Sequence, residues 1–196
     1  MPRVSKEQTD LNRVAIEEAS ARLFREQGIN GVSVNELMAA AGLTHGGFYG
    51  HFESKDALAA AACERAFSQS TARWEKRIAA APDGQAALAS IVQGYLSRTS
   101  RDAPGSACPV AALAGDVARE PTHKPVRAAY ATGLKSQLQM LESQLGSGDA
   151  AADRAQALTL YASLVGAMVL ARATDQDALS DELLDATRAQ LLAALE

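Results

Sequence analysis

The sequence predicts an all-α protein of about nine helices. Three observations support this prediction. Alanine occupies 42 of the 196 positions, and aromatic residues account for only 5% of the chain. Valine, isoleucine and threonine do not form the alternating runs that are typical of strands. Glycine and proline instead divide the chain into segments of helical length, and within these segments apolar residues recur at helical spacing.

The first predicted helix covers residues 9–27. We expect it to end at Gly28, because glycine is the usual residue just after a helix C-terminus. Its apolar side chains recur every three or four residues, so one face of the helix can pack against the rest of the protein. These side chains belong to Leu11, Ala15, Ile16, Ala19, Leu23 and Phe24.

Two short helices follow, separated by a tight turn. Ser33 and Glu36 form the pattern of a capping box, so the first should begin there and stop at Gly42. Thr44 is then expected to cap the second. Two short helices around a glycine-containing turn form a helix-turn-helix unit, whose second helix can enter the major groove of DNA. That helix, residues 44–52, holds three glycines. Each costs about 1 kcal/mol in a helix, so neighbouring elements must hold it.

The rest of the chain predicts six further helices. A long one begins at Ser54 and breaks at residues 82–84, and a shorter one starts near Cys108 and Pro109, since proline is tolerated at the first helical position. Glycines at residues 146–148 end the helix that follows Pro121 and Pro125. The remaining helices are expected over residues 85–98, 151–173 and 177–195.

Charge and composition exclude several classes of protein. The formal net charge of −4 excludes a strongly basic nucleic-acid coat protein, although an acidic body can carry a local DNA-binding surface. No apolar run approaches the roughly 18 residues that span a bilayer, and the first residues lack a signal region, so a cytoplasmic protein is expected. Cys63 and Cys108 are too few for a disulfide framework and form no zinc-ligand pattern. We expect no metal and no cofactor.

The sequence does not predict an enzyme. It contains no nucleophile elbow, metal signature or phosphate-binding loop. Residues 146–151 superficially fit a dinucleotide-binding fingerprint, but they follow a predicted helix instead of a strand and are interpreted as a loop. A helical interaction protein that does not bind DNA remains an alternative class.

One part of the chain resembles the TetR family of bacterial transcriptional regulators. The resemblance is specific over about residues 9–60, and its most distinctive string is Gly-Phe-Tyr-Gly-His-Phe-Glu-Ser-Lys-Asp-Ala-Leu at residues 47–58. It implies a helix-turn-helix DNA-binding domain at residues 1–53 and an effector-binding and dimerisation domain at residues 54–196. The matching residues are Ala19, Leu23, Phe24, Gly28, Ser33, Val34, Leu37, Ala41, Gly42, Leu43, Phe48, Tyr49, His51, Phe52, Lys55 and Leu58.

The resemblance also implies which residues meet DNA. His45, Gly46 and Gly47 match positions that face base edges. The other candidates match positions that contact phosphate or the DNA backbone or, at Ser33 and Asn35, either phosphate or a base. Because two of the base-facing residues are glycines, His45 is the best candidate for direct reading of bases, with Asn35 second. The full set is Ser33, Asn35, Thr44, His45, Gly46, Gly47, Tyr49, His51 and Lys55.

The predicted DNA-binding domain is not basic. Residues 1–55 hold six basic and seven acidic side chains. Phosphate contacts are therefore expected from hydroxyls, backbone N–H groups and a few cations, and binding should depend only modestly on salt. Arg3 and Lys6 of the N-terminal arm are candidates for a neighbouring groove, and DNA shape would supply part of the specificity.

The last two predicted helices carry apolar faces with two interpretations. They belong to the core or, as the resemblance implies, to a two-fold four-helix interface of a homodimer, which would place two DNA-binding domains on a palindromic operator. The residues concerned are Leu158, Tyr161, Ala162, Val165, Met168, Leu183, Leu184, Leu191 and Leu195. Phe67, Trp74 and Tyr95 are interpreted as core residues in preference to a ligand cage.

Cys108 also has two interpretations. It stands at a predicted helix N-terminus, where the helix dipole favours a thiolate, and Arg101 could add to this effect. The segment 106–119 resembles a subgroup of the family in which some members sense electrophiles or oxidants through this cysteine. The alternative is a small buried hydrophobe, as interpreted for Cys63.

The leading hypothesis is a homodimeric repressor of the TetR type. A small molecule, apolar or aromatic in character, would bind between the helices of residues 54–196 and release the protein from its double-stranded DNA operator. The alternative is a thiol-based redox or electrophile sensor acting through Cys108.

Overall fold

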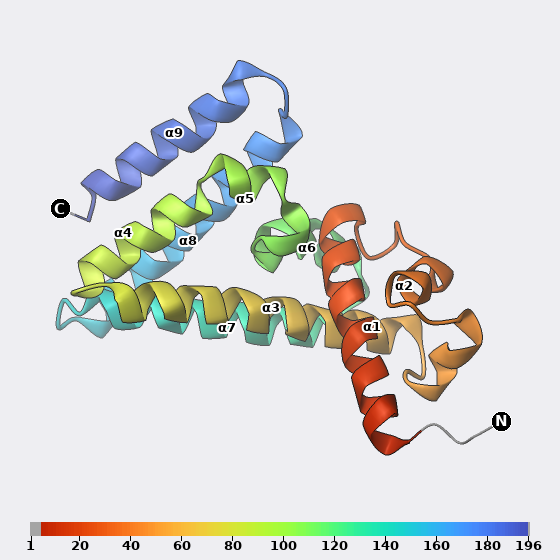
Figure 1. Ribbon diagram of the computed structural model, residues 1–196. Helices are drawn as coiled ribbons and strands as arrows, with labels where there is room; N and C mark the ends of the chain where they lie inside the picture. The colour runs from red at the N-terminus through yellow and green to blue at the C-terminus, as the bar shows by residue number, and fades with distance from the viewer. Residues whose placement is uncertain (1–4, 196) are drawn as a thin grey trace.

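The computed structural model describes residues 5–195, which form nine α-helices, two short 3₁₀ helices and no strand (Figure 1). The all-α prediction is therefore confirmed. The N-terminal helices form a small unit at one end, which we call the head. The remaining helices form a larger body, in which α3 and α7 lie side by side and α1 of the head crosses over α3.

The head contains three elements. They are α1 (Lys6–Gln27), α2 (Val34–Ala40) and the 3₁₀ helix η1 (His45–Gly50). Helix α1 begins earlier than expected because the Ser5 side chain accepts a hydrogen bond of 3.1 Å from the Gln8 backbone N–H, which caps the helix. The segment expected as a second α-helix is instead the 3₁₀ helix η1, since its three glycines disfavour the α conformation.

The body contains six longer α-helices and two short elements. Its α-helix α4 ends at Tyr95, before the expected residue 98, because Ser97 caps the separate short helix α5. The elements are α3 (Lys55–Ala80), α4 (Gly84–Tyr95), α5 (Arg98–Asp102), η2 (Pro104–Ser106), α6 (Pro109–Arg119), α7 (Pro125–Leu145), α8 (Ala150–Ala173) and α9 (Ala178–Ala193).

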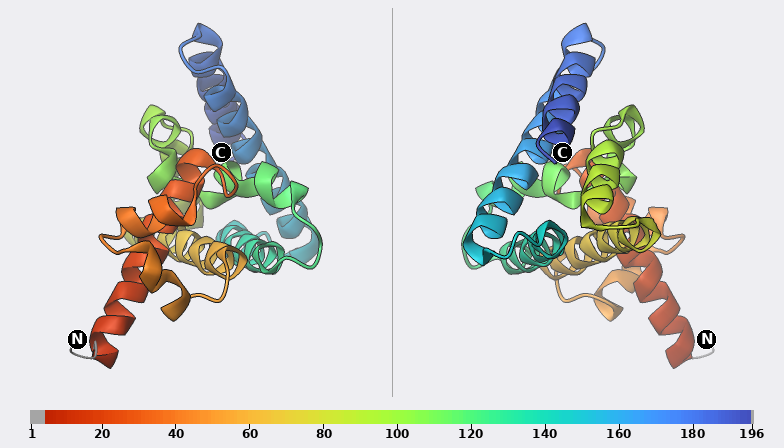
Figure 2. Two further views of the ribbon diagram at one scale, coloured as in Figure 1. Left: turned by 90° about the vertical axis from the view of Figure 1, so that its right-hand side faces the viewer. Right: turned by 90° about the vertical axis from the view of Figure 1, so that its left-hand side faces the viewer.

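Helices α3 and α7 run together in Figure 1 and lie next to each other when viewed from their ends in Figure 2. A Cβ added at Gly133 of α7 would lie 2.2 Å from the Phe67 ring of α3, so only glycine allows this approach. The Phe67 ring also packs edge-on against Tyr130, with ring centroids 5.6 Å apart. This contact sets the spacing of the two long helices in the body.

Helix α8 departs from one expectation. Among residues 5–195 it is the one helix long and apolar enough to cross a membrane, although no such segment was expected. It packs against α7 and α9 within the fold, and Leu160, Tyr161 and Leu164 are buried there. We therefore interpret it as a core helix.

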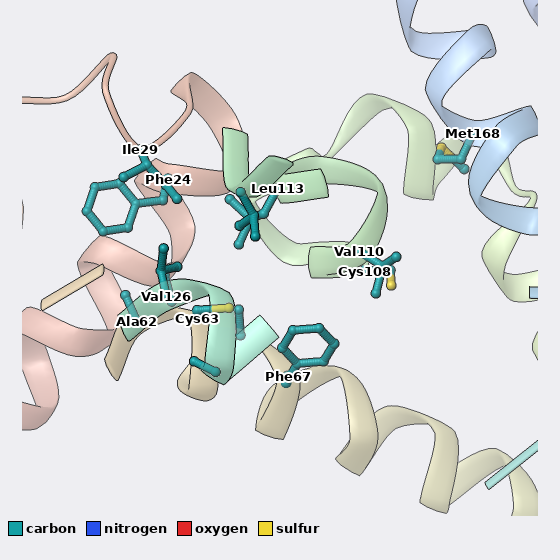
Figure 3. Packing of buried hydrophobic residues seen from close by; sticks show 14 of the residues in the cluster. Phe24, Ile29, Ala62, Cys63, Phe67, Cys108, Val110, Leu113, Val126 and Met168 are labelled. Carbon is teal, nitrogen blue, oxygen red and sulfur yellow. The ribbon is translucent and has the colours of Figure 1, made fainter. Parts of the chain in front are cut away.

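The core contains the residues expected there. Phe67, Trp74 and Tyr95 are buried, as predicted. Cys63 and Cys108 are both buried and free, and they lie in separate parts of the core (Figure 3). Burial raises the pKa of the Cys63 thiol to about 12, with a further contribution from the charge of Glu64. Cys63 is therefore a packing residue.

Candidate nucleic-acid interface

Helix α2 begins with a complete capping box. The Ser33 backbone N–H and hydroxyl donate to the Glu36 carboxylate at 2.7 and 2.6 Å, and the Glu36 N–H donates back to Ser33 Oγ at 3.3 Å. These bonds hold the pKa of Glu36 below its ordinary value. The Ser33 hydroxyl is thus already occupied, so it can contact a phosphate only by giving up its bond to Glu36.

Buried aromatic side chains hold η1 in place. Phe48 and Phe52 are both buried, and their rings stack with centroids 6.1 Å apart. Leu37 and Met38 of α2 belong to the same core cluster. A segment with three glycines therefore keeps its conformation through tertiary packing, as the sequence predicted.

The opposite side of η1 faces solvent. The Tyr49 side chain is 72% exposed although it follows the buried Phe48. His51 and Lys55 are half-buried, and the other predicted contact residues are exposed. These others are Ser33, Asn35, Thr44, His45, Gly46, Gly47 and Tyr49. The structure thus places all nine predicted residues in the head or at its junction with α3, within reach of a ligand in solvent.

Thr44 differs from its expected local role. It occupies the N-cap position of η1, but its side chain makes no capping hydrogen bond. The backbone N–H groups that precede the first i→i−3 hydrogen bond of η1, from Gly47 to the Thr44 carbonyl, are thus not capped by this hydroxyl. The Thr44 hydroxyl is therefore free of that role and is exposed for a contact outside the protomer.

The glycines of η1 are not required by the protomer itself. A Cβ added at Gly46 or Gly50 would meet no atom within 4 Å, and one at Gly47 would make an ordinary contact of 3.7 Å with Met38 Cε. None of the three has a positive φ. The protomer therefore has room for a methyl group at each position, and a small residue is needed there only if another molecule approaches closely.

A hollow of about 260 Å³ lies between η1 and the first turns of α1. Sequence reasoning gave no role to Thr9 and Asn12, which form the α1 side of this hollow, and it placed the start of α1 at residue 9 instead of Lys6. The Ser5 and Gln8 pair is itself a capping-box pattern and could have revealed the earlier start. The lining residues are Thr9, Asn12, Met38, Leu43, Thr44, Gly47, Gly50 and His51.

Few cations of the head are available to phosphates. Arg13 and Arg22 pair with carboxylates on their own helix, and Arg25 is buried. Within residues 5–55 this leaves Lys6 and Lys55 outside ion pairs, while the predicted arm residue Arg3 lies outside the described residues. The expectation that hydroxyls and backbone N–H groups carry most phosphate contacts stays a prediction, with Lys6 and Lys55 as the cations outside ion pairs.

A polar cluster lies inside the body and joins residues from α3, α7 and α8 with the start of α6. Gln137 Nε2 donates to Ser70 Oγ at 2.8 Å, and the Tyr161 hydroxyl donates to Gln137 Oε1. Cys108 Sγ lies 3.4 Å from the Tyr161 hydroxyl. Burial raises the pKa of Tyr161 well above its ordinary value, with a smaller effect from Cys108. All these side chains are buried, so the cluster is closed to bulk solvent.

The surroundings of Cys108 correct one sequence expectation. Arg101 does not approach the thiol, because its guanidinium bonds to Ser180 and Asp181 of the α9 region. Beside Cys108 there is instead a cavity of about 20 Å³, room for about one water molecule. The Tyr95 hydroxyl, which has no hydrogen-bond partner among residues 5–195, contributes to its lining with Cys108 and Arg172.

The N-terminal part of the chain is similar in sequence to known regulatory proteins. Residues 16–62 match the sequence profile of bacterial regulatory proteins of the tetR family. The chain is 38% identical over 58 residues to the HTH-type transcriptional regulator AcrR of Shigella flexneri, a match that spans 30% of this chain and 27% of AcrR. The chain therefore spans about a quarter of the length of this curated relative.

Solved structures cover almost the whole chain. A TetR-family transcriptional regulator from Cytophaga hutchinsonii superposes with a TM-score of 0.80 at 25% identity, over 100% of this chain and 98% of that one. The reduced form of NemR from E. coli superposes with a TM-score of 0.77 at 23% identity, over 92% of this chain and 94% of that one. Both the head and the body thus have the same fold as these structures.

Proposed function

We propose that the chain is a repressor of the TetR family, a cytoplasmic protein that binds a palindromic DNA operator as a homodimer. The observation that carries this proposal is the two-sided construction of η1. Phe48 and Phe52 fix one side in the core, and the other side presents Tyr49, His45 and bare glycine backbone to solvent. Such a surface suits close approach to a duplex.

The proposal is tested by selecting bound DNA from a random pool of double-stranded sequences. On the selected operator, a triple variant with His45→Ala, Tyr49→Ala and Lys55→Ala should bind about 1,000-fold more weakly, because removing each side chain from the DNA surface weakens binding by about tenfold. Lys135→Ala is the control, since it removes an exposed cation from α7 of the body. Undiminished binding by the triple variant would reject this contact surface.

Helices α8 and α9 supply the dimer interface in this proposal. They form a long pair that projects from the body (Figure 2). Tyr161, Met168 and Leu184 are buried within the protomer, so the sequence expectation that included them in the interface is replaced by a core role. The large apolar side chains left exposed on this pair belong to Leu158, Val169, Leu170 and Leu179.

Helix α6 is the element that would connect an effector in the body to the head. At its start, the Arg25 guanidinium of α1 donates to the Ala107 carbonyl at 3.0 Å. Near its end, Asp116 accepts a hydrogen bond of 2.9 Å from the Ile29 N–H, just after α1. A ligand that displaces α6 would therefore move α1, and with it the spacing of the two heads on DNA.

The polar cluster favours a second candidate function, a thiol sensor. Cys108 lies at the N-cap of α6, beside the Tyr161 hydroxyl and the Ala107 carbonyl held by Arg25. An electrophile such as N-ethylmaleimide would form a bond between Cys108 Sγ and an alkene carbon, and the thiol proton would pass to the neighbouring carbon. The adduct cannot fit in about 20 Å³, so it would displace α6.

N-ethylmaleimide treatment separates the two candidates. A thiol sensor should lose operator binding on treatment, and Cys108→Ser should retain binding. Cys63→Ser serves as the matched control, because Cys63 is also a buried thiol but lies away from the start of α6. Release that is undiminished in Cys108→Ser removes the thiol mechanism and leaves the apolar or aromatic small-molecule effector.

A further inference from the structure

Arg13 of α1 contacts the two residues that directly follow η1, His51 and Phe52. Its Nη1 donates a hydrogen bond of 2.7 Å to the carbonyl oxygen of His51, the residue that follows η1. Its guanidinium carbon also lies 4.3 Å from the centroid of the Phe52 ring. The charge-assisted hydrogen bond holds the backbone at His51, and the cation–π contact holds the Phe52 ring, so together they fix the position and orientation of the end of η1 relative to α1.

The same side chain begins a chain of ion pairs that leads to the body. Arg13 Nε lies 3.1 Å from Glu17 Oε1, and the other oxygen of Glu17 lies 3.2 Å from Arg65 Nη2 of α3. Glu17 is mostly buried between the two arginines, with 15% of its side chain exposed. The end of η1, α1 and α3 are thus joined through consecutive polar contacts outside the apolar core.

We propose that Arg13 is a positioning residue for DNA recognition, which holds His51 and Phe52 so that η1 presents Tyr49 and His45 at a fixed angle, and which links that angle to α3 through Glu17. This inference rests on the proposed function and adds to it a residue that itself touches no DNA. Arg13 donates through Nε and Nη1 inside the protomer and its charge is paired with Glu17, so in this proposal it makes no phosphate contact.

The rival role for a half-exposed arginine in a DNA-binding head is a direct phosphate contact. The two roles differ in salt dependence. Removal of one phosphate contact reduces the slope of log affinity against log salt by about 0.9, whereas removal of a positioning residue lowers affinity at an unchanged slope. Lys55→Ala, at a predicted phosphate-contact position, provides the reference for a reduced slope.

The experiment measures operator affinity at several salt concentrations for wild type, Arg13→Ala and Arg13→Lys. Arg13→Ala should bind about tenfold more weakly with the wild-type slope. Arg13→Lys should recover only part of this affinity, because a lysine over Phe52 cannot also reach His51 and Glu17 in the arginine geometry. Thermal unfolding of each variant checks that the weaker binding does not come from unfolding.

The chain provides a closely matched control in Arg22→Ala. Arg22 lies on the same helix, pairs with Glu26 at the same i,i+4 spacing, and has 50% of its side chain exposed against 47% for Arg13. It makes no hydrogen bond to η1 among residues 5–195. Its removal should change affinity by less than about twofold, although the change in charge is identical.

A second readout needs no DNA. The chain has three histidines, so the ring resonances of His51 can be followed by NMR. His51 Nδ1 is buried without a hydrogen-bond partner in the described part of the chain, and its environment therefore depends on how the segment is held. Arg13→Ala should shift the His51 resonances, and Arg22→Ala should leave them in place.

The outcomes are distinct. A slope reduced by about 0.9 in Arg13→Ala assigns Arg13 to phosphate and overturns the proposal. Unchanged affinity or unmoved His51 resonances overturn it as well. If wild type selects no DNA, the proposed function fails together with this inference. If wild type binds and Arg13→Ala binds equally well, only this inference fails.

Discussion

The Arg25 guanidinium donates a hydrogen bond of 3.0 Å to the carbonyl oxygen of Ala107, across 82 residues of sequence. Arg25 also donates to Ala21 of its own helix and to Gln69 of α3, so one buried side chain joins α1, α3 and the start of α6. Burial lowers its pKa to about 10, with a smaller effect from Arg73. The head therefore meets the body through a buried cation bound to neutral oxygens.

Arg25→Lys should destabilise the protein. Lysine keeps the buried charge but cannot reach three acceptors at once, so we expect a decrease of about 1–3 kcal/mol in the free energy of unfolding. Urea unfolding followed by Trp74 fluorescence measures this decrease. The exposed Arg22→Lys should change stability by less than about 0.5 kcal/mol. Equal stability of Arg25→Lys and wild type would contradict the role of these bonds.

Gly46→Ala should separate stability from DNA binding. The protomer has room for the added methyl group, and alanine is the better helix former by about 1 kcal/mol, so the variant should be at least as stable as wild type. Operator binding should weaken by about tenfold, because the methyl group would stand between the backbone of η1 and the duplex. Gly115→Ala, at an exposed position of α6, is the control and should leave binding intact. Full binding by Gly46→Ala would mean that this backbone does not approach DNA.

Leu170→Asp should weaken the proposed dimer. The Leu170 side chain is 53% exposed in the protomer, and a charge there would have to be buried between the α8–α9 pairs of two subunits. Sedimentation should show a shift towards monomer at micromolar concentrations. Leu11→Asp offers the comparison, since Leu11 is 58% exposed on α1, outside this surface. A Leu170→Asp protein that remains dimeric would place the interface elsewhere.

Cys63 should make stability depend on alkaline pH. Its folded pKa of about 12 lies above the unfolded value of 9.0, so its contribution is fully present below pH 9 and is lost as the pH rises towards 12. Between pH 9 and 11, wild type should lose about 1 kcal/mol per pH unit more than Cys63→Ala. The comparison uses slopes, because the alanine also leaves a small cavity. Parallel slopes would show that the thiol is not buried.

Local signals predicted much of the fold. Ser33, Ser54 and Gly146 end or begin helices where the sequence placed them, because a cap depends on neighbours within a few residues. The 3₁₀ form of η1 was not predicted, since the packing of Phe48 and Phe52 decides the conformation of a segment with so little intrinsic preference.

The sequence did not predict which face of each helix is buried, or which residues far apart in the sequence contact each other. In an alanine-rich helix such as α8, apolar residues occur on several sides, and only the packing shows that Tyr161 points inward while Leu158 points outward. The bond between Arg13 and His51 joins residues 38 apart, so no local pattern reveals it. Arg101 was expected near Cys108 but faces α9, where Asp181 offers the opposite charge.

The hydrogen bond from Gln137 to Ser70 restricts how α7 can be aligned against α3. Helix α3 is rich in alanine, so two larger features decide how far α7 can slide along it, the fit of the Phe67 ring against Gly133 and the bonds of the Gln137 amide. A slip of α7 would strand the Gln137 amide away from Ser70 and Tyr161, in a dry interior where an unmatched amide is costly. The amide thus selects the same alignment as the Phe67–Gly133 contact, and Gln137→Leu would fill the same space while leaving that contact alone to hold the alignment.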